Sequence, residues 1–178
     1  MQRFTTALLL FVLLAAVLAW GQAPPAMPKP GPEHQRLHYF VGTWHSEGDM
    51  KASPMGPAGK VSSNDHGEMV GDFFCAIHSD GTTPMGPMKA VGIMGYDPKT
   101  KMYTYDGFDN SGMHDLAKGS VSGKTWTFTD ENEIGGKKIK GRYTMTELSA
   151  TSYTFKFDMS EDGKTWNNIM EGKATKTK

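Results

Sequence analysis

The chain has 178 residues, 38% of them hydrophobic, with 19 basic side chains, 19 acidic side chains and one cysteine. This length is typical of a single domain, and the balanced charge without a basic block excludes the usual footprint of a nucleic-acid-binding protein. A lone cysteine excludes an internal disulfide, so the hydrophobic core must hold the fold together.

The first residues have the pattern of a secretory signal. Arg3 precedes an apolar stretch from Ala7 to Ala19, which is too short to span a bilayer. The small residues Gly21 and Ala23 favour cleavage after Ala23, with cleavage after Gly21 as the alternative. We therefore predict a periplasmic or secreted protein with no membrane span after cleavage. The signal peptide is expected at residues 1–23, a disordered proline-rich tether at 24–32 and the β-barrel domain at 33–176.

One short helix is predicted at 33–41, where Leu37, Phe40 and Val41 can share a face and Gly42 ends the helix. From Thr43 onward, turn residues recur at short intervals between runs rich in β-branched and aromatic residues. This spacing predicts an all-β fold, a single antiparallel meander of about ten strands. The predicted strands are 43–52, 59–70, 72–79, 87–96, 101–108, 114–122, 124–132, 137–147, 151–159 and 164–175.

The strands alternate between apolar and polar residues, most clearly at Tyr153, Phe155 and Phe157, and the aromatic face is expected to point inward. The same alternation predicts further inward side chains at Trp126, Phe128, Tyr143, Met145, Trp166 and Met170, and outward ones at Lys138, Lys140 and Arg142. An open meander of this length would leave two aggregation-prone edges, and closure into a barrel removes them.

Gly42-Thr43-Trp44, placed between the helix and the first strand, resembles the opening G-x-W motif of the calycins, whose tryptophan plugs the closed end of a barrel. A longer set of segments resembles the bacterial family known as domain of unknown function 1579. These segments are Pro32-Glu33-His34, Val41-Gly42-Thr43-Trp44, Pro84-Met85-Gly86-Pro87-Met88-Lys89, Met94-Gly95-Tyr96-Asp97, and the run from Leu148 through Ser152-Tyr153-Thr154-Phe155 to Met170-Glu171-Gly172. The resemblance implies a calycin-like barrel, of the class that includes lipocalins and fatty-acid-binding proteins, and it implies no activity.

A barrel of ten strands is wide enough to enclose a ligand, and its inward side chains give the main functional hypothesis. The expected lining combines apolar bulk with a few polar tips, as small-molecule pockets do. It consists of Trp126, Phe155 and Phe157 with Tyr105, Tyr143, Tyr153 and Asn168. We predict a small, largely apolar ligand; the alternative is an interior completely filled by these side chains.

His66 and Glu68 lie two residues apart and therefore share one face of a strand, together with Asn64. On the inner face they could bind a polar head group or act as acid and base, whereas on the outer face they would only be solvated. Cys75 and His78 are three apart, which places them on opposite sides of a strand and disfavours a catalytic pair. An enzyme acting on a small substrate stays an alternative, and a non-enzymatic role is favoured.

The segment Pro-Met-Gly-Pro occurs twice, at 54–57 and 84–87, in a chain with 13 methionines. Alternate connections of a meander lie at one end, so Met55, Met85, Met88 and His114 could form a soft-ligand copper site. Methionine as an adaptable apolar filler is the other interpretation. No cofactor is expected, because haem in small calycin-like barrels is held by a histidine on the last strand and this last strand has none.

Overall fold

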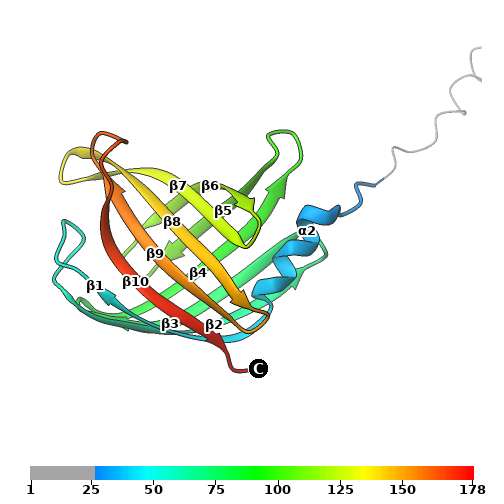
Figure 1. The fold of residues 1–178 in the computed structure, drawn as a ribbon, viewed down its shortest axis with the longest axis horizontal. Coiled ribbons are helices and arrows are strands. Elements are labelled where there is room, and N and C mark those ends of the chain that lie inside the picture. The colour runs from blue at the N-terminus through cyan, green and yellow to red at the C-terminus, as the bar shows by residue number, and fades with distance from the viewer. Residues whose placement is uncertain (1–26) are drawn as a thin grey trace, which may run out of the picture.

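The computed structural model describes residues 27–178, which form one closed antiparallel barrel of ten strands (Figure 1). Each strand pairs with its neighbours in the sequence, and β1 pairs with β10 to close the barrel. The strands are β1 Gly42–Met50, β2 Gly59–Val70, β3 Phe74–Thr83, β4 Gly86–Asp97, β5 Met102–Asp109, β6 His114–Ser122, β7 Thr125–Ile134, β8 Lys137–Ser149, β9 Ser152–Ser160 and β10 Asn167–Lys176. The predicted fold class and meander order are confirmed. The predicted signal peptide lies outside the described residues.

The N-terminal helical segment consists of α2 Pro32–Arg36 followed by the 3₁₀-helix η1 Leu37–Phe40, where the sequence predicted one helix at 33–41. Short helices often tighten into 3₁₀ geometry in their last turn. The segment leads directly into β1, so it lies at the end of the barrel where β1 begins, as Figure 1 shows. Leu37 is fully buried there and Phe40 is nearly so.

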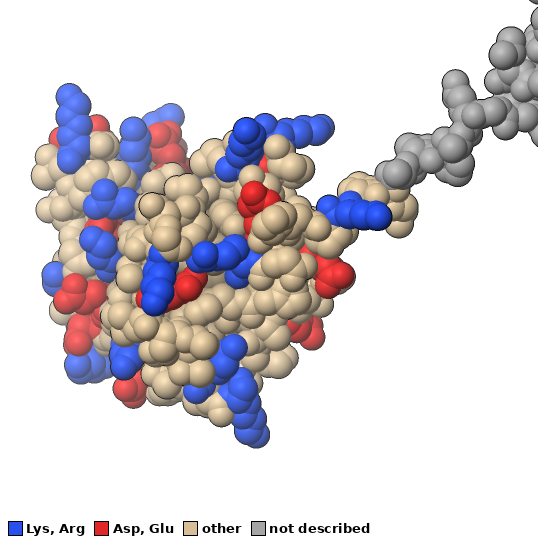
Figure 2. Space-filling model, turned by 45° about the vertical axis from the view of Figure 1, so that its right-hand side comes forward, with Lys and Arg blue, Asp and Glu red and all other residues tan. Residues whose placement is uncertain are grey.

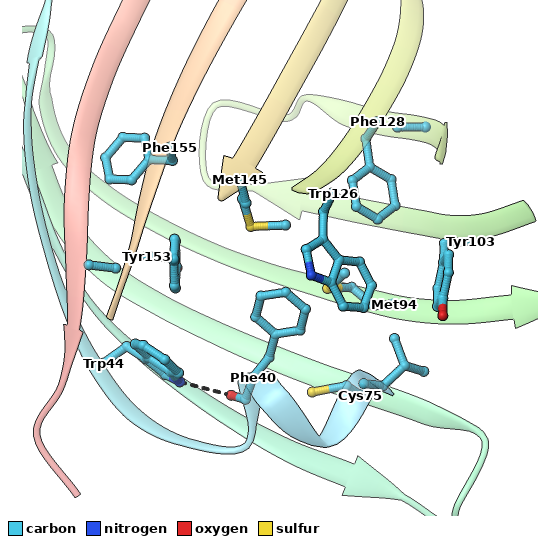
Figure 3. Close-up of a cluster of buried hydrophobic side chains, with 13 residues drawn as sticks. Phe40, Trp44, Cys75, Met94, Tyr103, Trp126, Phe128, Met145, Tyr153 and Phe155 are labelled. Atoms are coloured by element: carbon cyan, nitrogen blue, oxygen red, sulfur yellow. Dashed lines mark hydrogen bonds between the residues drawn. The ribbon is translucent and has the colours of Figure 1, made fainter. Parts of the chain in front are cut away.

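An aromatic cluster fills this closed end (Figure 3). Trp44 donates a hydrogen bond from Nε1 to the Phe40 carbonyl oxygen at 3.1 Å, and the Lys176 ammonium lies 4.9 Å from the centre of its ring. The Phe40 ring packs edge-on against Trp126 at a centroid distance of 5.0 Å. The tryptophan of the Gly-Thr-Trp segment therefore plugs the closed end, as the calycin resemblance implied.

Polar contacts tie the helical segment to the barrel wall. Arg36 donates to Glu147 Oε1 at 2.8 Å, and Trp126 Nε1 donates to the same oxygen at 2.7 Å. Tyr39 donates to the carbonyl oxygens of Ser149 and Ser152, which flank the turn between β8 and β9. Because every buried side-chain nitrogen and oxygen atom of the described residues has a hydrogen-bond partner, the helical segment closes the barrel without an unsatisfied buried side chain.

Contacts on the outer wall correct one sequence prediction. Trp166 lies outside the barrel, not inside, and Arg142 stacks over its ring at 4.1 Å. Arg142 also donates two hydrogen bonds to Asp158, which is only 3% exposed although it points away from the interior. The cause is that β10 begins at Asn167, so Trp166 belongs to the preceding loop, which folds over the outer face.

Charged side chains of both signs lie on the outer surface. On the face drawn in Figure 2, lysine and arginine side chains are interspersed with aspartate and glutamate side chains. Several of them form exposed ion pairs, such as Lys60 with Asp49 and Lys138 with Glu131. Within residues 27–178 no helix is long and apolar enough to cross a membrane.

Candidate functional site

The interior of the barrel contains a cavity of about 410 Å³. Every strand contributes to its wall, and Phe40 of η1 forms part of its floor at the closed end. This volume falls within the ~300–1,000 Å³ that small-molecule pockets typically have. The side chains of the ten strands therefore do not fill the barrel completely.

Glycines on the inner face help to keep this space open. The Tyr105 ring lies flat against the wall over Gly92 and Gly107, which are opposite each other on β4 and β5. A Cβ atom at Gly92 or at Gly107 would collide with the Tyr105 ring. Larger residues at these two positions would therefore force the ring away from the wall and into the cavity.

The two Pro-Met-Gly-Pro segments meet at the end of the barrel opposite the helix. The Met85 side chain packs against Gly56, and Pro84 packs against Gly59. Met55 and Met88 reach the cavity and form part of its wall, together with Thr82. The repeated segments thus form one side of the rim where the barrel is not closed by the helix.

Five of the residues predicted to line a pocket do so, and the structure brings them together. These residues are Tyr105, Tyr143, Tyr153, Phe155 and Phe157. Trp126 is 0% exposed and does not line the cavity, because it packs below it in the closed-end cluster (Figure 3).

The other predicted pocket residues lie elsewhere. The Asn168 amide group donates to the Asp158 carboxylate and to backbone oxygens, and its oxygen accepts a hydrogen bond from Lys51, all outside the cavity. The pairing of β9 with β10 shifts register between Asn168 and Met170, so the regular alternation of inward and outward side chains is broken at Asn168. His66 and Glu68 are exposed on the outer face of β2. Side chains alternate along a strand, and Asp65, which lies between Asn64 and His66, faces inward.

The metal candidates are separated by the barrel wall. Met55 and Met88 face the cavity, whereas Met85 is 64% exposed at the rim. His114 lies on the outer face, where its ring stacks on Phe108 and its Nε2 atom pairs with Asp106 at 2.8 Å. In the part of the chain that the structure describes, no three His, Cys, Asp or Glu side chains are placed to hold one metal ion.

The one cysteine is not placed for catalysis. Cys75 is completely buried, and burial raises the pKa of its thiol to about 11. His78 is exposed on the opposite face of β3, as the odd spacing predicted. A thiol that stays protonated at neutral pH is a poor nucleophile, so Cys75 serves as a small apolar side chain.

The tyrosine hydroxyls of the cavity are strongly shielded from bulk water. Burial, with smaller contributions from nearby carboxylates, raises the pKa of Tyr105 to about 12. Burial raises the pKa of Tyr143 well above its usual value, and the surface that this residue leaves exposed faces the cavity. The hydroxyl of Tyr143 has no hydrogen-bond partner among residues 27–178, so it is free to contact a ligand or water.

Three carboxyl groups also line the cavity, and none of them was predicted from the sequence. Asp65 of β2 accepts hydrogen bonds from Ser46 and Ser63, both at 3.1 Å and both on Oδ2. Asp115 of β6 and Asp130 of β7 lie near each other on the opposite part of the wall. The aromatic cavity is therefore also an acidic one.

The pKa of Asp130 shows the effect of placing two carboxyl groups close together in the cavity wall. Burial, followed by the neighbouring Asp115 carboxylate, raises the pKa of Asp130 from 3.8 to about 6. Its Oδ1 atom accepts a hydrogen bond from the Gly141 amide at 2.7 Å, which lowers the pKa but does not offset the other two effects. Raised carboxyl pKa values of this kind are more common at functional sites than elsewhere.

The raised pKa predicts how the Asp130→Asn variant behaves. Because the folded protein holds the proton more tightly than the unfolded chain, the Asp130 contribution to stability falls as the pH rises through about 6. Asparagine keeps the acceptor for Gly141 but cannot ionise. We expect the variant to be more stable than wild type by about 1 kcal/mol at pH 8, a value discounted for partial exposure, and equally stable at pH 4. Urea unfolding at both pH values measures this, and an equal effect at both would contradict it.

A second hollow, of about 540 Å³, lies on the outer wall near Trp166. It is larger than the internal cavity but wide open, and its wall includes the charged side chains of Lys118, Glu131 and Lys140. Ligand sites bury most of their ligand in concave, mainly apolar surroundings. The internal cavity meets this description and the outer hollow does not.

Comparisons with known proteins agree with the fold. The family model described as "Protein of unknown function (DUF1579)" matches residues 29–176. The crystal structure of Rv2717c from M. tuberculosis matches with a TM-score of 0.59 and 14% identity, covering 84% of this chain and 100% of that chain. The likeness to Rv2717c shows that the two chains share a fold.

Two further structures match less closely. A structure of EF1p2_mFAP2b bound to DFHBI has a TM-score of 0.46 and 14% identity, and covers 81% of this chain and 98% of that chain. The redesigned beta barrel mFAP0, also bound to DFHBI, has a TM-score of 0.45 and 14% identity, with coverages of 78% and 99%. No curated protein sequence matches this chain.

Proposed function

We propose that this chain, which belongs to the DUF1579 family of proteins of unknown function, binds a small molecule with an apolar body inside its barrel. The observation that carries the proposal is the internal cavity of about 410 Å³, closed at one end by the helical segment and lined by aromatic rings. A cavity of this size is far larger than a packing defect, because protein interiors are normally filled to the density of organic crystals.

The polar groups of the cavity support a ligand-binding role. An unsatisfied hydroxyl or amide in an apolar interior costs about 1–3 kcal/mol, so such groups are normally paired. The Tyr143 hydroxyl faces the cavity, and no partner for it exists within the described chain. A ligand, or water when the ligand is absent, would satisfy it.

The shape of the ligand follows from the walls. Phe128, Phe155 and Phe157 present apolar surface from β7 and β9, while serine, threonine and aspartate side chains gather on the part of the wall formed by β1, β2 and β3. A molecule with an aromatic or aliphatic body and a small polar end fits this lining. Met55 and Met88 at the rim are flexible apolar side chains that can adapt to such a body as it enters.

We also propose that the protein acts outside the cytoplasm, on the evidence of the N-terminal pattern of Arg3 and the apolar stretch from Ala7 to Ala19. The expected mature protein starts near Pro24. N-terminal sequencing of the protein from its native host, with fractionation of the cells, tests this, and a chain that retains Met1 in the cytoplasmic fraction would overturn it.

The binding function is tested with protein purified from its own host. Native mass spectrometry is expected to show a noncovalent adduct that disappears after solvent extraction. The extracted species can then be identified by its mass and returned to the apo protein. A clean apo mass, with no binding by any compound of the charge series described below, would count against a ligand-binding function.

A further inference from the structure

We infer that the ligand carries a positive charge, and that its cationic nitrogen pairs with Asp65 inside the barrel. The inference rests on the proposed function and narrows it to organic ammonium compounds with an apolar body. It also changes the sequence-based expectation of a largely apolar ligand, because it gives that ligand a charged end.

All the charged side chains that line the cavity are acidic. Three carboxyl groups line it, those of Asp65, Asp115 and Asp130, and no lysine, arginine or histidine does. None of the three forms an ion pair with any residue between 27 and 178, whereas the acidic residues Asp49, Asp80, Asp106 and Asp158 all do. A buried charge without a counter-ion destabilises the protein. A cationic ligand would supply the counter-ion that these carboxylates lack.

Asp65 is prepared to receive such a cation. Both of its hydrogen bonds, from the hydroxyls of Ser46 and Ser63, go to Oδ2, so Oδ1 has no partner among the described residues. The two serines hold the carboxylate in a fixed orientation on the wall. A charge-assisted hydrogen bond to a preorganised carboxylate is about twice as strong as a neutral one.

Further support comes from Tyr143, whose side chain lines the same cavity and whose hydroxyl has no hydrogen-bond partner within residues 27–178. Asp65 is among the charges that act on this hydroxyl, which places the two groups within electrostatic reach. A hydroxyl oxygen accepts a hydrogen bond from an ammonium group. The Tyr143 ring stacks on Phe155 at 6.1 Å, and such ring faces attract cations.

The same geometry disfavours two other ligand classes. A single metal ion would need several ligating groups at one point, and no three such side chains converge in the described chain. A carboxylate ligand, such as a fatty acid, would meet three acidic groups and no basic one. The occupant that matches the wall is a cation whose charge is attached to an apolar body.

A matched series of probes tests the charge. The compounds are 1-naphthylmethylammonium, 1-naphthalenemethanol and 1-naphthaleneacetate, which share one ring system and differ mainly in their polar end. Isothermal titration calorimetry at pH 7.5 is expected to show the ammonium binding about tenfold or more tightly than the alcohol, and the carboxylate binding weakest. The full chain without its signal segment, in apo form, is used throughout.

Two variants locate the charge. Asp65→Asn should lower the affinity for the ammonium to near that of the alcohol, with a much smaller effect on the affinity for the alcohol. Asp80→Asn is the matched control, because Asp80 is exposed on the outer face and pairs with Lys89. Retained alcohol binding also shows that the Asp65→Asn variant is folded.

The outcomes separate the two proposals. If the alcohol or the carboxylate binds as tightly as the ammonium, or if Asp65→Asn leaves the preference intact, the barrel binds small molecules but the charge assignment is overturned. If none of the three compounds binds and protein from the host is clean apo, the proposed function itself is overturned. An ammonium preference that is lost in Asp65→Asn and kept in Asp80→Asn supports the inference.

Discussion

Replacing Trp126 with alanine is expected to lower the free energy of unfolding by about 3–5 kcal/mol. Trp126 is 0% exposed, packs against Phe40 and Tyr103, and donates its indole hydrogen bond to Glu147. The substitution removes one of the two tryptophan side chains of the closed-end cluster and takes one hydrogen-bond donor from Glu147. Both losses act on the folded state, so they should add to a large destabilisation.

Urea unfolding followed by far-ultraviolet circular dichroism measures this effect without depending on the removed indole. Trp166→Ala is the matched control, because Trp166 is partly exposed on the outer wall and contacts mainly Arg142. We expect the control to cost about 1 kcal/mol. Equal losses in the two variants would mean that the closed-end cluster does not dominate the stability of the barrel.

Replacing Ala90 with phenylalanine is expected to reduce the affinity for the tightest-binding naphthyl compound about 100-fold or more, with a small change in stability. Ala90 lies on the inner face of β4 and lines the cavity. A phenyl ring at this position points into free space, so it competes with the ligand without displacing core side chains.

The control for this variant lies three residues further along the same strand. Ile93 is 42% exposed on the outer face of β4, so Ile93→Phe adds a ring outside the barrel. Calorimetric titration of both variants is expected to show binding only in Ile93→Phe. If Ala90→Phe binds as well as wild type, the ligand site lies elsewhere, and the outer hollow near Trp166 becomes the next candidate.

The fold was predictable because it depends on patterns between residues that are close in the sequence. Turn residues separate the strands at regular spacing, and strand alternation identifies the buried face wherever aromatic residues mark it, as at Tyr153 and Phe155. The prediction erred at Trp166, where alternation was extended past the start of β10 into a loop. It erred at Asn168 because the register shifts there.

The site was only partly predictable, for two different reasons. Alternation from Trp126 and Phe128 also places Asp130 on the inner face. A charged residue is not expected in a core, so Asp130 was not predicted as a lining residue. On β2 no aromatic residue marks either face, and the choice between Asp65 and His66 could not be made from the strand alone. Only pairing with β1 and β3 fixes which of them points inward.

The seam between β1 and β10 has a kinetic consequence. It joins residues from opposite ends of the domain, with Trp44 opposite Lys176 and Thr177 bonded to Thr43 across 134 residues. Contacts so distant in the sequence close late and slowly, because the loop entropy must be lost before they form. The barrel therefore cannot close until β10 has left the ribosome, and a chain truncated before β10 would expose the unpaired edges of β1 and β9 to other chains.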